Sequence, residues 1–288
     1  MFSIIFDKIS RLSFDLYHYF STRTEVPVVY FDGRKNVGDL VNSYLLDKMF
    51  GYKCYRAKTN LLPHLRIVGS VLGSASKNSF IFGGGSIDGR SDSIRLKGSR
   101  VFALRGKLSL DIVRECCASP SLSVPLGDPA LLLPFFYNPK INRSVRVGLI
   151  PHFADKSEFI NSFVRGNKDI ELIDVEVEVE DFLDQLAGCE FVLSSSLHGL
   201  IIADAYGIPN KWLTLSSSVL GAGFKFRDYY STTNSPCEIP VDVRSHDDMS
   251  VVIDKIEELC AVKEYNYDLS DLMSAIKKIP GAHERFKV

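Results

Sequence analysis

Residues 191–209, FVLSSSLHGLIIADAYGIP, contain the features that decide the fold. The short apolar run Phe191–Leu193 is typical of a buried strand, and it ends at three serines. The spacing of apolar residues then predicts a helix over His198–Tyr206, which Gly207 and Pro209 stop. A strand followed at once by a helix is the repeating unit of a parallel sheet.

The same alternation extends over most of the chain. It predicts strands at 28–31, 67–72, 79–82, 100–104, 145–150, 170–175, 191–193 and 211–215, and helices at 38–50, 109–117, 157–165, 180–187, 198–206, 249–262 and 269–278. Residues 174–181 fit either an edge strand or a loop. A proline-rich joint at 134–140 divides the chain. We therefore expect an α/β protein of two Rossmann-like domains, residues 1–137 and 138–288, that face a central cleft.

Composition excludes several classes of protein. The 288 residues carry 34 Lys+Arg against 35 Asp+Glu, a net charge of −1, which argues against nucleic acid as a partner. The six cysteines form no Cys-x-x-Cys pair, so we expect no metal site and reduced thiols in a cytoplasmic protein. No uninterrupted apolar run reaches about 18 residues, so no transmembrane helix is expected.

The N-terminal segment allows two interpretations. Residues 1–20 are rich in large apolar side chains at helical spacing, without the apolar core and small-residue cleavage site of a signal peptide. One interpretation is a helix packed on its own domain or on a partner. The other is peripheral contact with a membrane surface, which the lack of a strongly basic face makes weaker.

The turn between residues 193 and 199 has the chemistry of an anion site. Backbone N–H groups at the start of a helix lack intrahelical partners, and the hydroxyls of Ser194, Ser195 and Ser196 add donors. His198 places a titratable imidazole beside them. The alternative is that the serines only cap the helix and that His198 is a structural residue.

The stretch SSSLHGLIIADAYGIP resembles the signature of the polysaccharide pyruvyl transferase family. Six further segments resemble family elements in the same order: Asn36-Val-Gly-Asp39, Phe82-Gly-Gly-Gly-Ser86, Leu104-Arg105-Gly106, Gly127-Asp-Pro-Ala-Leu-Leu132, Ile150-Pro-His-Phe-Ala-Asp155 and Phe224-Lys-Phe-Arg-Asp228. The segments are spread over residues 36–228, which is most of the chain. One position departs from the family pattern, because Ser196 stands where many members have arginine.

The resemblance implies a fold similar to GT-B glycosyltransferases, with the N-terminal domain on the acceptor side and the C-terminal domain on the donor side. It implies transfer of the pyruvyl group of phosphoenolpyruvate onto two hydroxyls of one sugar, which forms a ketal and releases phosphate. No metal or other cofactor is implied. The implied acceptor is a lipid-linked oligosaccharide or polysaccharide in exopolysaccharide or capsule synthesis, which suits a cytoplasmic protein or one peripheral at the inner face of the membrane.

Site residues follow from the matched segments. We expect His198 to be the general acid or the proton donor on the phosphate side, while Asp39, Asp128 and Asp155 are open alternatives for the base on a sugar hydroxyl. Because the donor carries a phosphate and a carboxylate, its site needs cations. The donor-binding residues are predicted to be Arg105, Ser194, Ser195, Ser196, Gly199, Lys225 and Arg227, with Lys225 and Arg227 on one face if that segment is extended. The residues predicted to line the cleft are Asn36, Gly38, Gly84, Gly85, His152 and Asp155.

Two other functions compete with this one. The first is a GT-B glycosyltransferase that uses a nucleotide sugar, because one fold hosts many activities. The second is a catalytically silent scaffold of polysaccharide assembly, which the departure at Ser196 favours. A dinucleotide site is not expected at Gly83–Gly85, since Asp88 occupies the last glycine position of the Gly-x-Gly-x-x-Gly motif.

Overall fold

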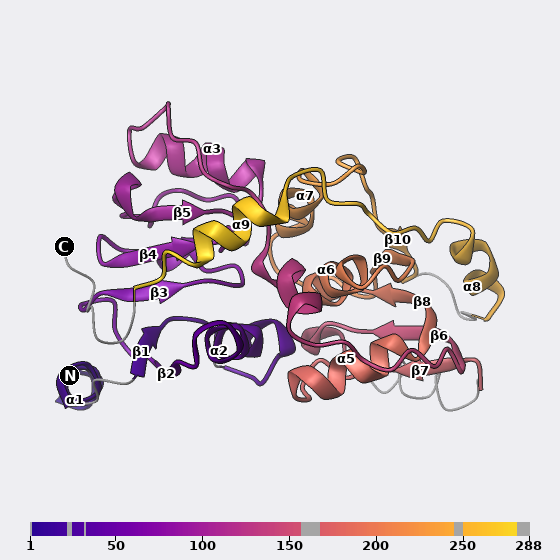
Figure 1. Cartoon of the computed structure of the whole chain (residues 1–288), viewed down its shortest axis with the longest axis horizontal. Helices are drawn as coiled ribbons and strands as arrows, with labels where there is room; N and C mark the ends of the chain where they lie inside the picture. Colours follow the sequence, from indigo (N-terminus) through magenta and orange to yellow (C-terminus); the bar gives the residue numbers. More distant parts are fainter. Residues whose placement is uncertain (1, 22–24, 32, 157–167, 245–249, 281–288) are drawn as a thin grey trace.

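The computed structural model describes residues 2–21, 25–31, 33–156, 168–244 and 250–280. It contains two parallel five-stranded sheets, in the orders β2-β1-β3-β4-β5 and β10-β9-β8-β6-β7. Figure 1 shows the two sheets side by side along the long axis of the molecule. The predicted pair of parallel-sheet α/β domains is therefore confirmed, while the likeness to GT-B enzymes stays a prediction.

Each half interleaves strands and helices as a parallel sheet requires. The first half contains β1 (Glu25–Val28), α2 (Val37–Phe50), β2 (Lys53–Arg56), β3 (His64–Arg66), η1 (Leu72–Ser74), β4 (Ser79–Phe82), η2 (Gly98–Arg100), β5 (Val101–Ala103), α3 (Lys107–Cys116) and η3 (Pro129–Phe135). The second half contains β6 (Val145–Ile150), η4 (Phe153–Asp155), β7 (Ile170–Leu172), α5 (Val179–Ala187), β8 (Cys189–Ser194), α6 (Leu197–Ala205), β9 (Asn210–Thr214), α7 (Phe224–Tyr230), β10 (Val241–Asp242), α8 (Ser250–Glu257) and α9 (Leu269–Ile276).

The expected strand at 67–72 is wrong, because this apolar run is a buried loop that follows β3. Ile67 and Val68 are fully buried. The side chain of Asn42 replaces a strand partner there, since its oxygen accepts the Val68 N–H at 2.9 Å and its nitrogen donates to the Val68 carbonyl at 3.3 Å. The short strands β2 and β10 were not predicted. The helix expected at 157–165 lies outside the described residues, and residues 174–178 form a loop before α5.

The two halves are held together at several points. Helices α2 and α5 pack against each other, and ion pairs join Arg34 to Glu176 and Lys48 to Glu180 beside them. The end of the chain also returns to the first half, because α9 packs against β5 and η3 and crosses the first sheet in Figure 1. The domain boundary expected at residues 137–138 lies between the two sheets. It places α9 in the second domain, although this helix packs against the first half.

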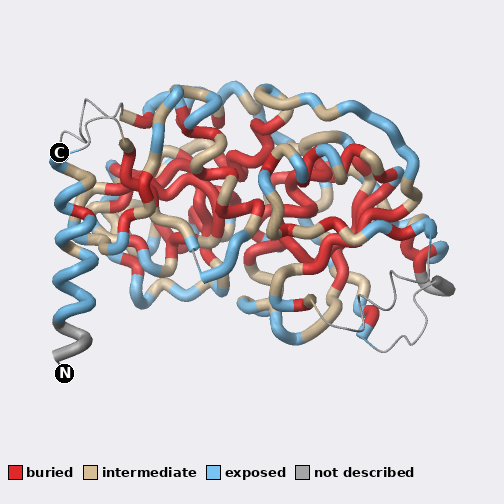
Figure 2. Tube along the Cα trace, turned by 90° about the horizontal axis from the view of Figure 1, so that it is seen from below, coloured by how far each residue is buried: buried red, intermediate tan, exposed pale blue. Residues whose placement is uncertain are grey.

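Helix α1 (Phe2–Ser21) lies at one end of the molecule (Figure 2) and contacts the first half through one face. The buried carboxylate of Asp15 accepts the backbone N–H groups of Lys58 at 2.8 Å and Thr59 at 2.7 Å. Phe6 and Phe20 remain 77% and 58% exposed. Packing on its own domain is thus confirmed for one face, and contact with a membrane surface stays a prediction. None of the described helices is long and apolar enough to cross a membrane.

Candidate active site

A cavity of about 440 Å³, here called the central cavity, lies between the two halves. The segments that follow β1 and β3 and the start of α2 line it from the first half, and the segments that follow β6 and β8 together with α7 line it from the second. Carboxyl ends of parallel strands are where α/β folds bind ligands. Among the described residues, no group of three or more His, Cys, Asp or Glu side chains could hold a metal ion.

His198 lines the central cavity from the first turn of α6, backed by a buried carboxylate. Its Nε2 lies 3.6 Å from Oδ2 of Asp128, and neither atom has a hydrogen-bond partner among the described residues. The other oxygen of Asp128 accepts the N–H of Ala130 at 3.0 Å and so begins η3. Asp128 is fully buried behind His198 and does not line the cavity, so it is not placed to reach a sugar hydroxyl there.

The predicted Asn-x-Gly-Asp element forms the N-terminus of α2 and faces His198. Asn36 caps the helix, since its side-chain oxygen accepts the Gly38 N–H at 3.1 Å. Glycine is required at position 38, because an added Cβ would stand 2.0 Å from Nδ1 of His198. Asn36 and Asp39 line the central cavity.

The Asp39 carboxyl is only 8% exposed. Burial raises its pKa to about 6, although His198 and the backbone N–H of Phe31 oppose the increase. A carboxyl with such a pKa can exchange a proton near neutral pH. Of the three aspartates considered as the base, Asp39 is the one that lines the central cavity.

Lys225 and Arg227 do not share a face, and the extended conformation considered for their segment is wrong. The segment is helix α7, in which residues two apart point in different directions. Lys225 lines the central cavity, whereas Arg227 lines a neighbouring cavity at the carboxyl end of β9, here called the β9 cavity. One small donor molecule in the central cavity would therefore meet Lys225 and not Arg227.

The Lys225 side chain is an unpaired cation in the central cavity. Its residue is 7% exposed, and within the described part of the chain its Nζ has no hydrogen-bond or ion-pair partner, only the ring of Phe226 at 5.4 Å. Burial and the charge of Arg105 lower its pKa to about 8. The carboxyl groups of Asp155 and Asp39 oppose this decrease in pKa, but among the described residues neither forms an ion pair with Lys225. A buried ammonium without a direct ion-pair partner is a candidate for binding an anionic ligand.

Arg105 connects the two halves instead of lining the central cavity. It is fully buried, and its Nε and Nη2 each lie 3.0 Å from Oδ2 of Asp228. The remaining N–H groups donate to the hydroxyl of Ser70 and the carbonyl of Ser86. The predicted contact with the donor would require this ion pair to open, so Arg105 acts on the cavity through its charge near Lys225.

The three serines have different surroundings. Ser194 is structural, because its hydroxyl donates to the carbonyls of Ile150 at 2.9 Å and Ser196 at 3.0 Å. Ser195 donates to Asp155 and lines the β9 cavity. Ser196 begins α6 and lines the central cavity. The predicted site residues that are buried without lining either cavity are Gly38, Gly84, Gly85, Arg105, Asp128, Ser194 and Gly199.

His152 and Asp155 are hydrogen-bonded through the backbone, since the Asp155 N–H donates to the His152 carbonyl at 2.7 Å. The Ser195 hydroxyl joins them, since it accepts the His152 backbone N–H at 2.9 Å and donates to Asp155. His152 lines the central cavity, and burial together with Lys225 and His198 lowers its pKa to about 3. Its ring is therefore neutral at physiological pH. Asp155 lines the β9 cavity and also accepts a hydrogen bond from Ser216.

The sequence did not single out the aromatic pair that closes one wall of the central cavity. Phe31 follows β1 and Phe153 follows β6, and their rings stack across the two halves at 6.0 Å and 9°. Both side chains line the cavity, and Phe31 is 52% exposed. Phe31 is the last residue of the strand predicted at 28–31, which the structure places instead at Glu25–Val28, and Phe153 lies three residues beyond the strand predicted at 145–150. These places at the carboxyl ends of predicted strands were the signal available. Such rings can pack against the C–H face of a sugar.

Comparison with known proteins identifies the family of this chain. The family model for polysaccharide pyruvyl transferases matches residues 36–217. The chain belongs to the polysaccharide pyruvyl transferase family. The match contains His198, Asp39 and Asp128 and ends before Lys225 and Arg227.

Two curated proteins are similar to this family member. The uncharacterized protein L143 of Acanthamoeba polyphaga mimivirus is 32% identical over 220 residues, which is 73% of this chain and 75% of that protein. The succinoglycan biosynthesis protein ExoV of Rhizobium meliloti is 25% identical over 221 residues, 73% of this chain and 66% of ExoV. A solved structure from Klebsiella pneumoniae has 13% identity and a TM-score of 0.39, over 76% of this chain and 92% of that one.

Proposed function

We propose that this protein transfers the pyruvyl group of phosphoenolpyruvate to two hydroxyls of one sugar in a surface-polysaccharide precursor. The product is a pyruvate ketal, and inorganic phosphate is released. The observation that carries the proposal is the buried Lys225 ammonium, unpaired among the described residues, in the cavity that also holds His198 and Asp39. Membership of the family supports pyruvyl as the group transferred.

Anion binding is the first requirement of this reaction, because phosphoenolpyruvate carries a phosphate and a carboxylate. Lys225 supplies a full positive charge at the cavity wall. The N–H groups of Leu197 and His198 at the start of α6 lack intrahelical partners and lie at the positive end of the helix dipole, whereas the Ser196 N–H already donates to the Ser194 hydroxyl at 2.9 Å. Together these groups supply the positive charge that the family's arginine would add at position 196.

The chemistry then needs an acid and a base. A proton adds to the methylene carbon, a sugar oxygen bonds to the adjacent carbon, the bond from that carbon to the phosphate oxygen breaks, and the second sugar oxygen closes the ring. The two hydroxyl protons end on the new methyl group and on the phosphate. His198 is the proposed donor to the methylene carbon, oriented by Asp128, and Asp39 is the proposed acceptor of a hydroxyl proton.

Calorimetric titration with phosphoenolpyruvate tests the donor site. Replacing Lys225→Met should weaken binding by about tenfold or more, since a charge-assisted contact contributes about 1.5–3 kcal/mol. The matched control is Lys97→Met, at an exposed lysine, which should leave binding unchanged. Wild-type affinity should also fall as pH rises above about 8, because Lys225 then loses its charge.

Two results would count against the proposal. Unchanged binding in Lys225→Met would remove the donor site assigned to the central cavity. Binding of a nucleotide sugar, without binding of phosphoenolpyruvate, would favour a glycosyltransferase. If the donor binds, a lipid-linked oligosaccharide is the acceptor that we propose, with the protein in the cytoplasm at the inner face of the membrane, and phosphate release with that acceptor is the assay.

A further inference from the structure

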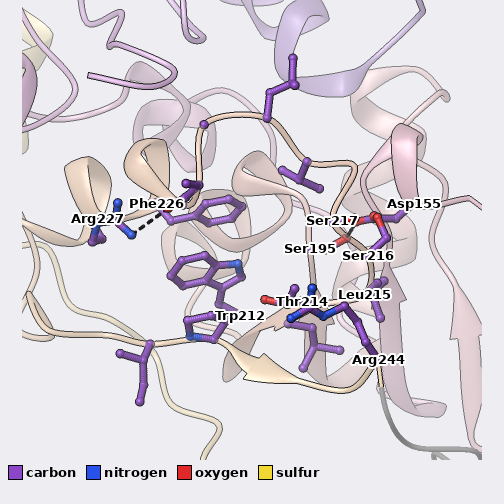
Figure 3. Close-up of a pocket in the computed structure, with 18 of the residues that line it drawn as sticks. Asp155, Ser195, Trp212, Thr214, Leu215, Ser216, Ser217, Phe226, Arg227 and Arg244 are labelled. Atoms are coloured by element: carbon purple, nitrogen blue, oxygen red, sulfur yellow. Dashed lines mark hydrogen bonds between the residues drawn. The ribbon is translucent and has the colours of Figure 1, made fainter. Parts of the chain in front are cut away.

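The β9 cavity has no role in the reaction proposed above. Its volume is about 530 Å³, within the range of about 300–1,000 Å³ typical of small-molecule sites. It lies at the carboxyl end of β9, between the loop that precedes α7 and the segment around β10. In Figure 3 the stacked rings of Trp212 and Phe226 lie between Arg227 and Arg244.

Donor groups in this cavity are left without acceptors. Arg227 donates to the carbonyl of Ala222 at 3.0 Å, and the described residues supply no carboxylate to balance its charge. The indole N–H of Trp212 makes no hydrogen bond with the part of the chain that the structure describes, although Trp212 is only 6% exposed. A ligand that complements these groups must supply acceptor oxygens and negative charge.

The acidic groups of the cavity are already occupied. Glu238 pairs with Lys211, and Asp155 accepts the hydroxyls of Ser195 and Ser216. Arg244 is paired with its neighbour Asp242. Asp155 keeps its negative charge, because hydroxyl donors do not neutralise a carboxylate. Among the lining residues that the structure describes, Arg227 is the cation without an ion-pair partner, so an anionic group bound beside it would meet an available positive charge.

The rest of the wall suits a ring larger than an inorganic ion. Trp212 and Phe226 stack at 4.3 Å and 10°, and Leu220 and Ile239 are 71% and 72% exposed at the rim. Apolar patches next to hydroxyls and N–H donors match the C–H faces and oxygens of a sugar. Phosphate or carboxylate attached to a sugar combines both requirements.

The two cavities are adjacent. Leu220 lines both of them. The neighbouring residues Ser195 and Ser196 line different cavities, Ser195 the β9 cavity and Ser196 the central cavity. Resting on the proposed function, we propose that the β9 cavity binds an acidic sugar, one carrying a phosphate or a carboxylate, that adjoins the sugar receiving the pyruvyl group. The protein would then select its acceptor by a charge outside the reacting ring.

Calorimetric titration with glucose 1-phosphate, glucuronate and methyl glucoside tests this proposal. Trp212 is the single tryptophan of the chain, so a change in its fluorescence provides a second readout located in the cavity. We expect saturable binding of at least one acidic sugar and weaker binding of methyl glucoside. The two acids distinguish phosphate from carboxylate as the preferred charge.

Three variants locate the binding. Arg227→Gln should weaken binding of the acidic sugar by about tenfold or more. Because the Arg227 side chain is exposed, this substitution should not disturb folding. Trp212→Phe retains an aromatic ring but removes the N–H donor, and it should weaken binding less. Lys225→Gln should leave binding of the acidic sugar unchanged while it weakens binding of phosphoenolpyruvate.

The proposal is overturned if neither acidic sugar binds, if methyl glucoside binds equally well, or if the loss occurs in Lys225→Gln and not in Arg227→Gln. Much tighter binding of UDP-glucose than of glucose 1-phosphate would also overturn it and indicate a nucleotide site. The same preparation is also titrated with phosphoenolpyruvate, which tests the proposed function independently. The acidic sugar depends on Arg227 and phosphoenolpyruvate on Lys225, so one proposal can fail while the other holds.

Discussion

Replacing Asp39→Asn should stabilise the protein while it impairs the reaction. The pKa of the Asp39 carboxyl is about 6, against 3.8 for an unburied aspartate, because the group is buried at the cavity wall. Between about pH 4 and pH 6 the folded protein holds a proton that the unfolded chain has lost, so the free energy of unfolding falls as pH rises through this window. Each unit of difference in pKa between the folded and unfolded states corresponds to about 1.4 kcal/mol. Ionisation of Asp39 near pH 7 therefore lowers the free energy of unfolding by about 3 kcal/mol.

Asparagine has nothing to ionise, so the variant should be more stable than wild type by up to about 3 kcal/mol at pH 7 and by almost nothing near pH 4. Urea unfolding followed by circular dichroism across this pH range measures the difference. Asp47→Asn, on the exposed face of the same helix, is the matched control and should show no such pH dependence. An equal difference between Asp39→Asn and wild type at pH 4 and pH 7 would refute the reasoning. Phosphate release should fall by about 100-fold or more.

Three further substitutions have expected outcomes. Gly38→Ala places a methyl group 2.0 Å from Nδ1 of His198, so phosphate release should fall by about 100-fold, and an unaltered rate would contradict the contact. Gly106→Ala directs its Cβ to 1.8 Å from the Asp228 carbonyl oxygen and should lower the free energy of unfolding by about 3 kcal/mol, measured by urea denaturation. Arg105→Ala leaves the buried Asp228 carboxylate without its cation and should cost about 3–5 kcal/mol in the same assay, whereas a loss below about 1 kcal/mol would show that the pair is not important for stability.

The elements that local patterns determine were predicted well. Helix α2 was expected at 38–50 and spans Val37–Phe50, because Asn36 and Gly51 cap a run with helical spacing. Strand β6 was expected at 145–150 and has these bounds. Asp39 and His198 were both expected at the site because their segments resemble family elements, and both line the central cavity. The sequence left Asp128 and Asp155 as equal candidates for the base.

The failures depend on contacts between distant segments. Residues 67–72 are as apolar as a strand, but Asn42 holds their backbone as a loop. Arg105 pairs with Asp228 of the other half of the molecule. The two residues are 123 positions apart in the chain, so no local sequence pattern predicts their contact. The helical conformation of α7, which sends Lys225 and Arg227 to different cavities, follows a turn with positive φ angles at Gly221 and Gly223.

The return of α9 to the first sheet has a consequence for how the protein is made. On the ribosome, β1 to β5 emerge long before Leu269–Ile276, the helix that packs against β5. The buried residues Leu272 and Ile276 belong to the same core as strands of the first half, so that core stays incomplete until Ile276 has been synthesised. Domains usually fold in order as they emerge. In this chain, the half that is synthesised first is completed last, and a truncation before α9 should leave apolar surface open to chaperones.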